Sequence, residues 1–297
     1  MTTSSRLTVL LVVSAACSRG AVPPPLASPA PPTGKVDVAR AVEPPVDPSA
    51  RAAAAWQGRA KRAQAERAIA LFESLAADGG DAARLTLLAR AYCFLAGEHL
   101  APDGDATAAL AAYAQGMRAG EAALLASAPG LAAKVAQGEA VDELLPLIGG
   151  ASADAAYWYL ESVRGFTLAK GLTALVYYRQ RIVRLAARLL ELDGALFHAG
   201  PHRSLALFYA ESPSAAGGDL GKARAEFERA LALEPHYLAI KVAFAESYAT
   251  RVHDRELVTR LLGEAVADAT LLPEVEPEQA MARARAQKLL AHVDELF

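Results

Sequence analysis

Two histidines four residues apart are the first candidates for chemistry in this sequence. On an uninterrupted helix, His198 and His202 would share one face, a spacing at which two imidazoles can bind one metal ion. Gly200 and Pro201 lie between them, and such a pair interrupts a helix. Because no third ligand follows nearby in the sequence, we predict a loop here and no metal. The sequence indicates no other cofactor.

The sequence also contains none of the common catalytic motifs. It has no G-x-S-x-G element, no glycine-rich phosphate loop and no C-x-x-C pair. Carboxylates such as Glu226 and Glu228 lie among arginines and lysines at helical spacing, which predicts a solvated helix face rather than an acid–base pair. The net charge is −3 and no basic block is present, so a nucleic-acid footprint is absent. We expect neither an enzyme nor a nucleic-acid-binding protein.

Aromatic side chains concentrate in the segment 155–168, although aromatic residues make up only 6% of the sequence. Tyr157, Trp158 and Phe166 would line an apolar ligand groove, in which the tyrosine hydroxyl and the indole N–H provide polar contacts. The alternative is a core helix whose rings pack inside the protein. The sequence leaves both interpretations open.

Cys17 is a candidate for covalent modification. Arg6, the apolar run 7–13 and the small residues 14–16 have the order of a secretory signal. The sequence V-S-A-A-C resembles a bacterial lipobox, in which the cysteine is lipidated and becomes the new N-terminus. We predict a lipoprotein signal peptide at 1–17 and a membrane contact through the lipid anchor alone. The alternative is an ordinary secretion signal with an incidental cysteine.

The composition changes twice after this cysteine. Residues 18–50 contain nine prolines and many alanines, which predicts an extended tether rather than a packed segment. From residue 51 to 297, apolar residues recur at three- and four-residue steps, and this period predicts an all-α domain. Cys93 lies within such a pattern and is predicted to be a buried thiol.

The helices have a repeating pattern. Ala223, Phe227, Ala230 and Pro235 have the spacing A-x3-F-x2-A-x4-P, which is the second-helix signature of a tetratricopeptide repeat. Small residues let paired helices approach closely, the phenylalanine fills the gap between pairs, and proline ends the unit. Looser copies recur along the chain at spacings of 34 to 41 residues. We predict an α-solenoid or superhelical bundle of degenerate tetratricopeptide-like helix pairs; the alternative is an irregular helical bundle.

Five stretches of the chain together resemble the T-component lipoproteins of tripartite ATP-independent periplasmic (TRAP) transporters. They occur in the family's order and lie at 111–125, 154–171, 217–235, 238–266 and 288–297. The resemblance implies a lipid-anchored, periplasm-facing helical protein that forms a homotrimer and associates with the solute-binding P-component. It also implies an apolar channel for a hydrophobic ligand in each protomer.

Two functional hypotheses follow. In the first, the protein is an accessory subunit of solute uptake that docks a periplasmic solute-binding protein and holds an apolar ligand. In the second, it is an interaction scaffold of the cell envelope whose grooves bind a protein partner and no small molecule. A tunnel through the 155–190 region favours the first, and a solid core with a polar concave face favours the second. Ser18 after the lipobox cysteine favours the outer membrane by analogy with lipoprotein sorting.

Overall fold

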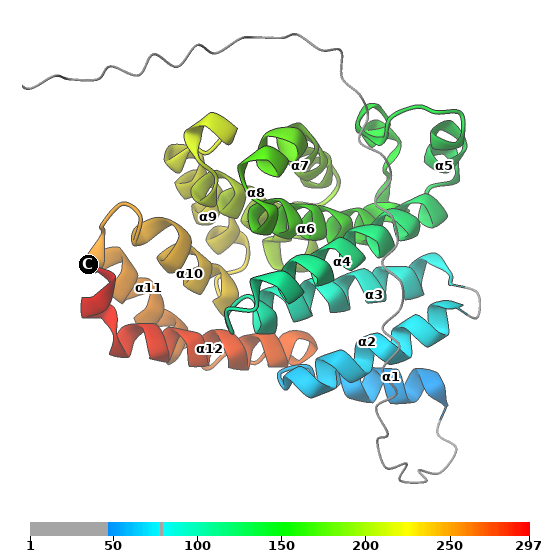
Figure 1. Cartoon of the computed structure of the whole chain (residues 1–297). Coiled ribbons are helices and arrows are strands. Elements are labelled where there is room, and N and C mark those ends of the chain that lie inside the picture. Colours follow the sequence, from blue (N-terminus) through cyan, green and yellow to red (C-terminus); the bar gives the residue numbers. More distant parts are fainter. Residues whose placement is uncertain (1–46, 78–79) are drawn as a thin grey trace, which may run out of the picture. The chain divides into compact units, whose positions relative to one another are not determined.

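The computed structural model describes residues 47–77 and 80–297, and the prediction of an all-α fold is confirmed for these residues. They form twelve α-helices, two π-helical segments and several short 3₁₀ turns, without a strand (Figure 1). The predicted signal peptide, the lipidation site Cys17 and nearly all of the predicted tether lie outside the described residues. The first helix begins at Pro48, so it includes the last residues of the segment predicted as a tether.

The helices have the following bounds. The first six are α1 (Pro48–Gln57), α2 (Arg62–Ala77), α3 (Ala82–Phe94), α4 (Ala106–Ser127), α5 (Pro129–Ala136) and α6 (Ala153–Lys170). The last six are α7 (Leu172–Leu192), α8 (Leu196–Glu211), α9 (Leu220–Leu233), α10 (Leu238–Phe244), α11 (Arg255–Ala267) and α12 (Glu276–Ala291). The π-helical segments are η1 (Leu95–Leu100), which continues α3, and η6 (Ala245–Ala249), which continues α10.

Aspartate side chains begin many of these helices. In five of them the N-cap carboxylate accepts a hydrogen bond from a backbone N–H in the first turn: Asp47, Asp81, Asp105, Asp219 and Asp254. Each such cap contributes about 1 kcal/mol, because it satisfies a donor that the helix itself leaves free. Gly171 separates α6 from α7 with a φ of 97°, a backbone conformation that other residues rarely adopt. Local chemistry therefore sets where the helices begin and end.

Glycines allow α4 and α6 to pack closely. A Cβ atom on Gly120 would lie 2.8 Å from the Tyr159 Cα atom, and one on Gly116 would lie 2.7 Å from the Ser162 Oγ atom. On α6, Gly165 leaves room for the Tyr113 ring of α4 in the same way. Larger residues at these positions would push the two helices apart.

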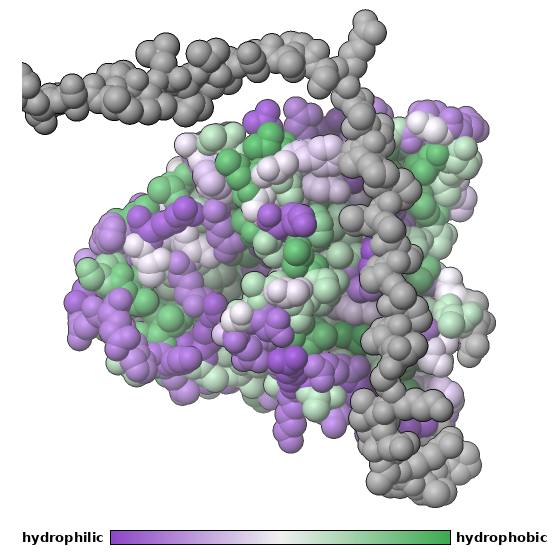
Figure 2. Space-filling view, in the orientation of Figure 1, coloured by the Kyte–Doolittle hydropathy of each residue, from purple (hydrophilic) through white to green (hydrophobic). Residues whose placement is uncertain are grey.

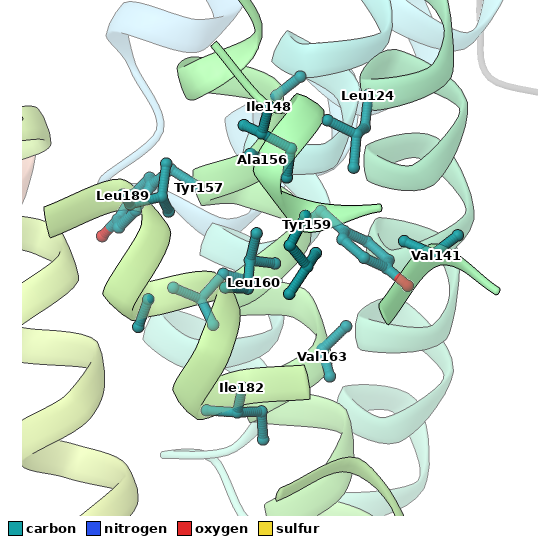
Figure 3. Close-up of a cluster of buried hydrophobic side chains, with 14 of the residues drawn as sticks. Leu124, Val141, Ile148, Ala156, Tyr157, Tyr159, Leu160, Val163, Ile182 and Leu189 are labelled. Carbon is teal, nitrogen blue, oxygen red and sulfur yellow. The ribbon is translucent and has the colours of Figure 1, made fainter. Parts of the chain in front are cut away.

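Helix α6 passes through the largest of three buried hydrophobic clusters. Figure 3 shows Leu160 and Val163 of α6 among Leu124, Ile182 and Leu189 from neighbouring helices. Tyr157 and Tyr159 point to opposite sides of α6, and both are fully buried. This helix therefore joins α4 on one side to α7 and α8 on the other.

Successive helices form packed pairs, as the repeat pattern indicates. In the pair α8–α9, the residues Ala223, Phe227 and Ala230 are fully buried, and the Phe227 ring stacks on Phe244 of α10 at 4.7 Å between ring centroids. Helix α9 ends two residues before Pro235. The exposed face predicted for α9 has one exception, Glu226, which is buried against the imidazole of His202.

The two ends of the helical domain also contact each other. Helix α12 runs along the lower edge in Figure 1, and its first turns lie beside α1 and α2. Hydrophilic side chains gather along this lower edge in Figure 2. Arg59, which follows α1, binds Glu278 of α12. The helix pairs therefore surround a central region instead of stacking only on their sequence neighbours.

Candidate functional site

Two concave, partly open spaces, which we call the central cavity and the inner chamber, lie among the helices. The central cavity has a volume of about 360 Å³ and lies between α4 and α6 on one side and α8, α10 and α12 on the other. The inner chamber has a volume of about 110 Å³ and is bounded by α3, α6 and α8. The two adjoin, because Glu98, Tyr113 and Arg164 line both.

Each cavity also adjoins a groove on the surface. The α12 groove, of about 660 Å³, shares Glu98, Glu246 and Arg285 with the central cavity. The α3 groove, of about 490 Å³, shares Trp158 and Phe197 with the inner chamber. The four spaces thus form a series that crosses the domain from α12 to α3.

The two π-helical segments place polar side chains on this series of cavities. Segment η1 contributes Glu98, and segment η6 contributes Glu246 and Ser247. A π-helical turn inserts an extra residue into an α-helix and occurs often at functional sites. The pattern that predicts α-helices carries no signal for these insertions.

The three aromatic residues predicted to line a groove occupy different surroundings. Trp158 lines both the inner chamber and the α3 groove. Tyr157 is buried behind it, and its hydroxyl accepts a hydrogen bond from Arg203 at 2.9 Å. Phe166 lies elsewhere on α6, where its ring contacts Tyr178 of α7 at 6.4 Å between centroids. The structure therefore brings Tyr157 and Trp158 together and separates Phe166 from them.

A backbone segment in an uncommon conformation borders the inner chamber. Phe197, His198 and Ala199 have φ values of 46°, 56° and 54°, so three consecutive residues other than glycine are left-handed. Each such residue costs roughly 1 kcal/mol or more and persists only where its surroundings hold it. The Phe197 ring stacks on Tyr157 at 5.0 Å, and the His198 ring stacks on Tyr237 at 4.6 Å. This segment places Phe197 between the inner chamber and the α3 groove.

Charged side chains are prominent among the apolar walls of the two cavities. Arg164 pairs with Glu161 at 3.1 Å and with Glu211 at 3.6 Å, and Glu161 also accepts a hydrogen bond from Ser204. Burial alone would raise the pKa of the Glu161 carboxyl group, but Arg164, Arg203 and the Ser204 hydroxyl outweigh burial and lower it. The lining therefore holds ionised groups inside the protein.

Among the described residues, two arginines of the inner chamber each have a buried N–H group without a hydrogen-bond acceptor. Arg90 pairs with Glu278 at 3.3 Å and lies over the Trp158 ring, yet its buried Nε atom has no partner. Arg203 donates to Tyr157 through Nη2, and its buried Nη1 atom has no partner within residues 47–77 and 80–297. Buried donors without an acceptor are uncommon in proteins.

Glu98 lies where the central cavity, the inner chamber and the α12 groove meet, and it lines all three. Its side chain is exposed, and the structure gives it neither a hydrogen bond nor an ion pair. No motif in the sequence marks this residue.

The two histidines with metal-ligand spacing have separate partners. His198 contacts Glu234 at 3.3 Å, whereas His202 contacts Glu226 at 2.6 Å. His202 belongs to the regular part of α8, and the break in the helix occurs at the left-handed residues before Gly200. Over residues 47–77 and 80–297, no cluster of three metal-ligating side chains occurs.

Helix pairs around adjoining cavities define a class of binding proteins, in which the helices provide the concave surfaces that a ligand or a partner can occupy. The chain belongs to the TRAP transporter T-component family, whose family model matches residues 88–297. No curated protein is a significant match to the chain.

Family membership establishes an accessory role in a TRAP transporter system and a place in the cell envelope. The described helices include none that is both long and apolar enough to cross a bilayer. The family is one of transporter accessory components, which is not a catalytic role.

Proposed function

We propose that the protein is a lipid-anchored, periplasm-facing accessory subunit that docks the solute-binding P-component and holds a small ligand in its adjoining cavities. The observation that carries this proposal is the series of adjoining cavities in a chain of the T-component family. The resemblance implies an apolar channel, and the charged lining adds polar contacts to apolar walls.

The alternative function is a protein-interaction scaffold without a small-molecule ligand. Such a scaffold needs grooves on its surface but no enclosed space. The inner chamber brings Trp158, Arg203 and Glu161 together around a space of about 110 Å³, a size that suits part of a small molecule better than a protein segment.

Native mass spectrometry of the full-length protein tests this proposal. We expect a homotrimer that carries a small-molecule adduct, and co-purification with a TRAP solute-binding protein when both are produced together. A monomer without adduct that does not bind the solute-binding protein would favour the scaffold function.

The lipid anchor is tested by replacing its cysteine. We expect Cys17→Ala to move the protein from the membrane fraction to the soluble fraction. Cys93→Ala is the matched control, because Cys93 is the buried cysteine within the described residues. Retention of the Cys17→Ala protein in the membrane would exclude an anchor at this residue.

A further inference from the structure

Two charged side chains of the cavity lining lack the ion pairs that their neighbours have. Glu98 has no polar partner, and Arg203 has no carboxylate within ion-pair distance, among the described residues. The other acidic and arginine side chains that line the central cavity and the inner chamber all form ion pairs. The Glu98 carboxylate faces three adjoining spaces, and the Nη1 atom of Arg203 is a buried donor without an acceptor among the described residues, so both groups are available to a ligand.

Both side chains belong to the same chamber but come from different elements. Glu98 lies on η1, which continues α3, and Arg203 lies on α8. Arg203 is held in place, because Nη2 donates to the Tyr157 hydroxyl at 2.9 Å and the guanidinium lies 5.1 Å from the Tyr237 ring centroid. Its Nη1 atom then has no acceptor. Among the described residues, the chamber thus presents one arginine and one carboxylate that form no ion pair, and the arginine keeps one N–H group without an acceptor.

We propose that the inner chamber binds the zwitterionic head of a free amino acid, with the ligand carboxylate at Arg203 and the ligand ammonium at Glu98. Arginine binds carboxylates through a planar set of donors, and a carboxylate is the natural partner of an ammonium group. A ligand with a single charge would leave either Arg203 or Glu98 without a partner. This inference rests on the proposed ligand-holding function and specifies its ligand.

The size of the two cavities fits a ligand of this kind. The chamber, of about 110 Å³, has room for a small polar head, and the adjoining central cavity of about 360 Å³ has room for a side chain. The central cavity has an apolar surface formed by Leu168, Leu207 and Val242, and this surface suits an aliphatic side chain.

Calorimetric titration of the full-length protein with four probes of one carbon skeleton tests the inference. Norleucine carries both charges, hexanoate carries only the carboxylate, hexylamine only the ammonium, and 1-hexanol neither. We expect norleucine to bind at least about tenfold more tightly than each of the others, because a hydrogen bond to a charged group contributes enough free energy for that ratio.

Two variants test which charged group of the ligand each side chain binds. In Glu98→Gln, hexanoate should bind as tightly as norleucine, because the ammonium has lost its partner. In Arg203→Met, hexylamine should bind as tightly as norleucine. Arg203→Lys keeps the positive charge if the methionine variant folds poorly. Glu256→Gln and Arg179→Met are the matched controls, because both residues are exposed and lie outside the cavities.

The outcomes separate this inference from the proposed function. Equal affinity for norleucine and 1-hexanol, or an unchanged preference in both variants, would overturn the zwitterion site. If the protein nevertheless retains a neutral adduct in native mass spectrometry, the ligand-holding function stands and the inference on its ligand fails. If no probe binds and no adduct is retained, both fail.

Discussion

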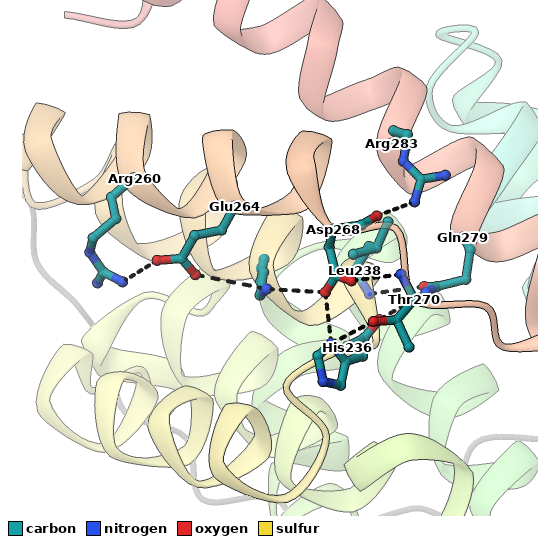
Figure 4. Close-up of polar contacts among 9 residues, drawn as sticks. His236, Leu238, Arg260, Glu264, Asp268, Thr270, Gln279 and Arg283 are labelled. Carbon is teal, nitrogen blue, oxygen red and sulfur yellow. Dashed lines mark hydrogen bonds and ion pairs between the residues drawn. The ribbon is translucent and has the colours of Figure 1, made fainter.

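Asp268 illustrates how single residues stabilise the C-terminal helices. Its carboxylate accepts hydrogen bonds from the Thr270 backbone N–H and from His236, both at 2.9 Å, and Lys241 lies 3.6 Å away (Figure 4). Its backbone carbonyl accepts a hydrogen bond from Arg283. Burial alone would raise the pKa of this carboxyl group, but the hydrogen bonds from Thr270 and His236 lower it well below its usual value.

We predict that Asp268→Asn lowers the free energy of unfolding by about 1–3 kcal/mol at neutral pH. A carboxyl group whose pKa is lowered in the folded state stabilises the protein above its unfolded pKa of about 4. This contribution decreases as the pH falls below that value, so the parent and the variant should converge in acid. Urea unfolding at several pH values measures the difference.

A surface aspartate is the control for this measurement. The Asp294 side chain is 82% exposed and pairs with Arg255, so Asp294→Asn should change stability by less than about 1 kcal/mol. A difference between Asp268→Asn and the parent that does not vary with pH would contradict the assigned role of the charge.

Charged residues whose surroundings come from other helices were the least predictable residues in this sequence. Glu226 has the helical spacing of a solvated residue, yet its partner His202 comes from the preceding helix. Glu98 and Arg203 resemble the many other charged residues of the helices, and only the fold shows that they face one chamber. Trp158, in contrast, was a candidate from the sequence because aromatic residues are rare in it.

At the scale of elements, the contact between α4 and α6 depends on Gly165. A Cβ atom there would lie 2.1 Å from the Tyr113 Cε1 atom, so the ring would have to move. We predict that Gly165→Ala lowers the free energy of unfolding by about 1–3 kcal/mol, as over-packing does. Thermal and urea unfolding measure this loss.

A helical glycine with open space beside it is the matched control. Nothing lies within 4 Å of a Cβ atom built on Gly263 in α11. Gly263→Ala should therefore raise the free energy of unfolding by about 0.5–1 kcal/mol, because alanine favours helices. If both substitutions had the same sign, close packing at Gly165 would not be the cause.

The stack between Phe227 and Phe244 holds α9 against α10. Because Phe227 is fully buried, we predict that Phe227→Ala lowers the free energy of unfolding by about 3–5 kcal/mol through the cavity it creates. Leu233→Ala on the same helix is the control, since Leu233 is 48% exposed and should cost less than about 1 kcal/mol. Equal losses would show that the repeat position has no special packing role.

The sequence predicted the helices well and their irregularities poorly. The 3.6-residue period indicated an all-α domain, and twelve α-helices lie within the described residues. The spacing of Ala223 and Phe227 indicated which face of α9 is buried. The π-helical segments and the left-handed residues at 197–199 were not predicted, because stacking rings and distant contacts stabilise them.

At the scale of the whole molecule, the cavities arise from contacts that local patterns do not encode. The central cavity is lined by α4 and α6 and by the later helices α8, α10 and α12. Its existence therefore depends on how α12 returns beside the first helices. The resemblance to the T-component family implied a channel, and the family match supports the same class of protein. Neither the local sequence patterns nor the family resemblance predicted the charged side chains that line the cavities.

The contact between the two ends of the helical domain is centred on Arg59. Its side chain is only 1% exposed, its Nε atom donates to Glu278 at 3.1 Å, and its Nη1 atom donates to the Trp56 carbonyl at 2.9 Å. The guanidinium also lies 4.5 Å from the Trp56 ring centroid. Residues 219 positions apart are thereby joined.

We predict that Arg59→Met lowers the free energy of unfolding by about 3–5 kcal/mol, because it leaves Glu278 partly buried without its main partner. The double variant Arg59→Met, Glu278→Gln should recover part of this loss, since the unpaired charge is then absent. Arg62→Met is the control, because Arg62 pairs with Glu66 on the surface and its loss should change stability little. Urea unfolding provides all three values, and a loss at Arg59 no larger than at Arg62 would show that this pair does not hold the two ends of the domain together.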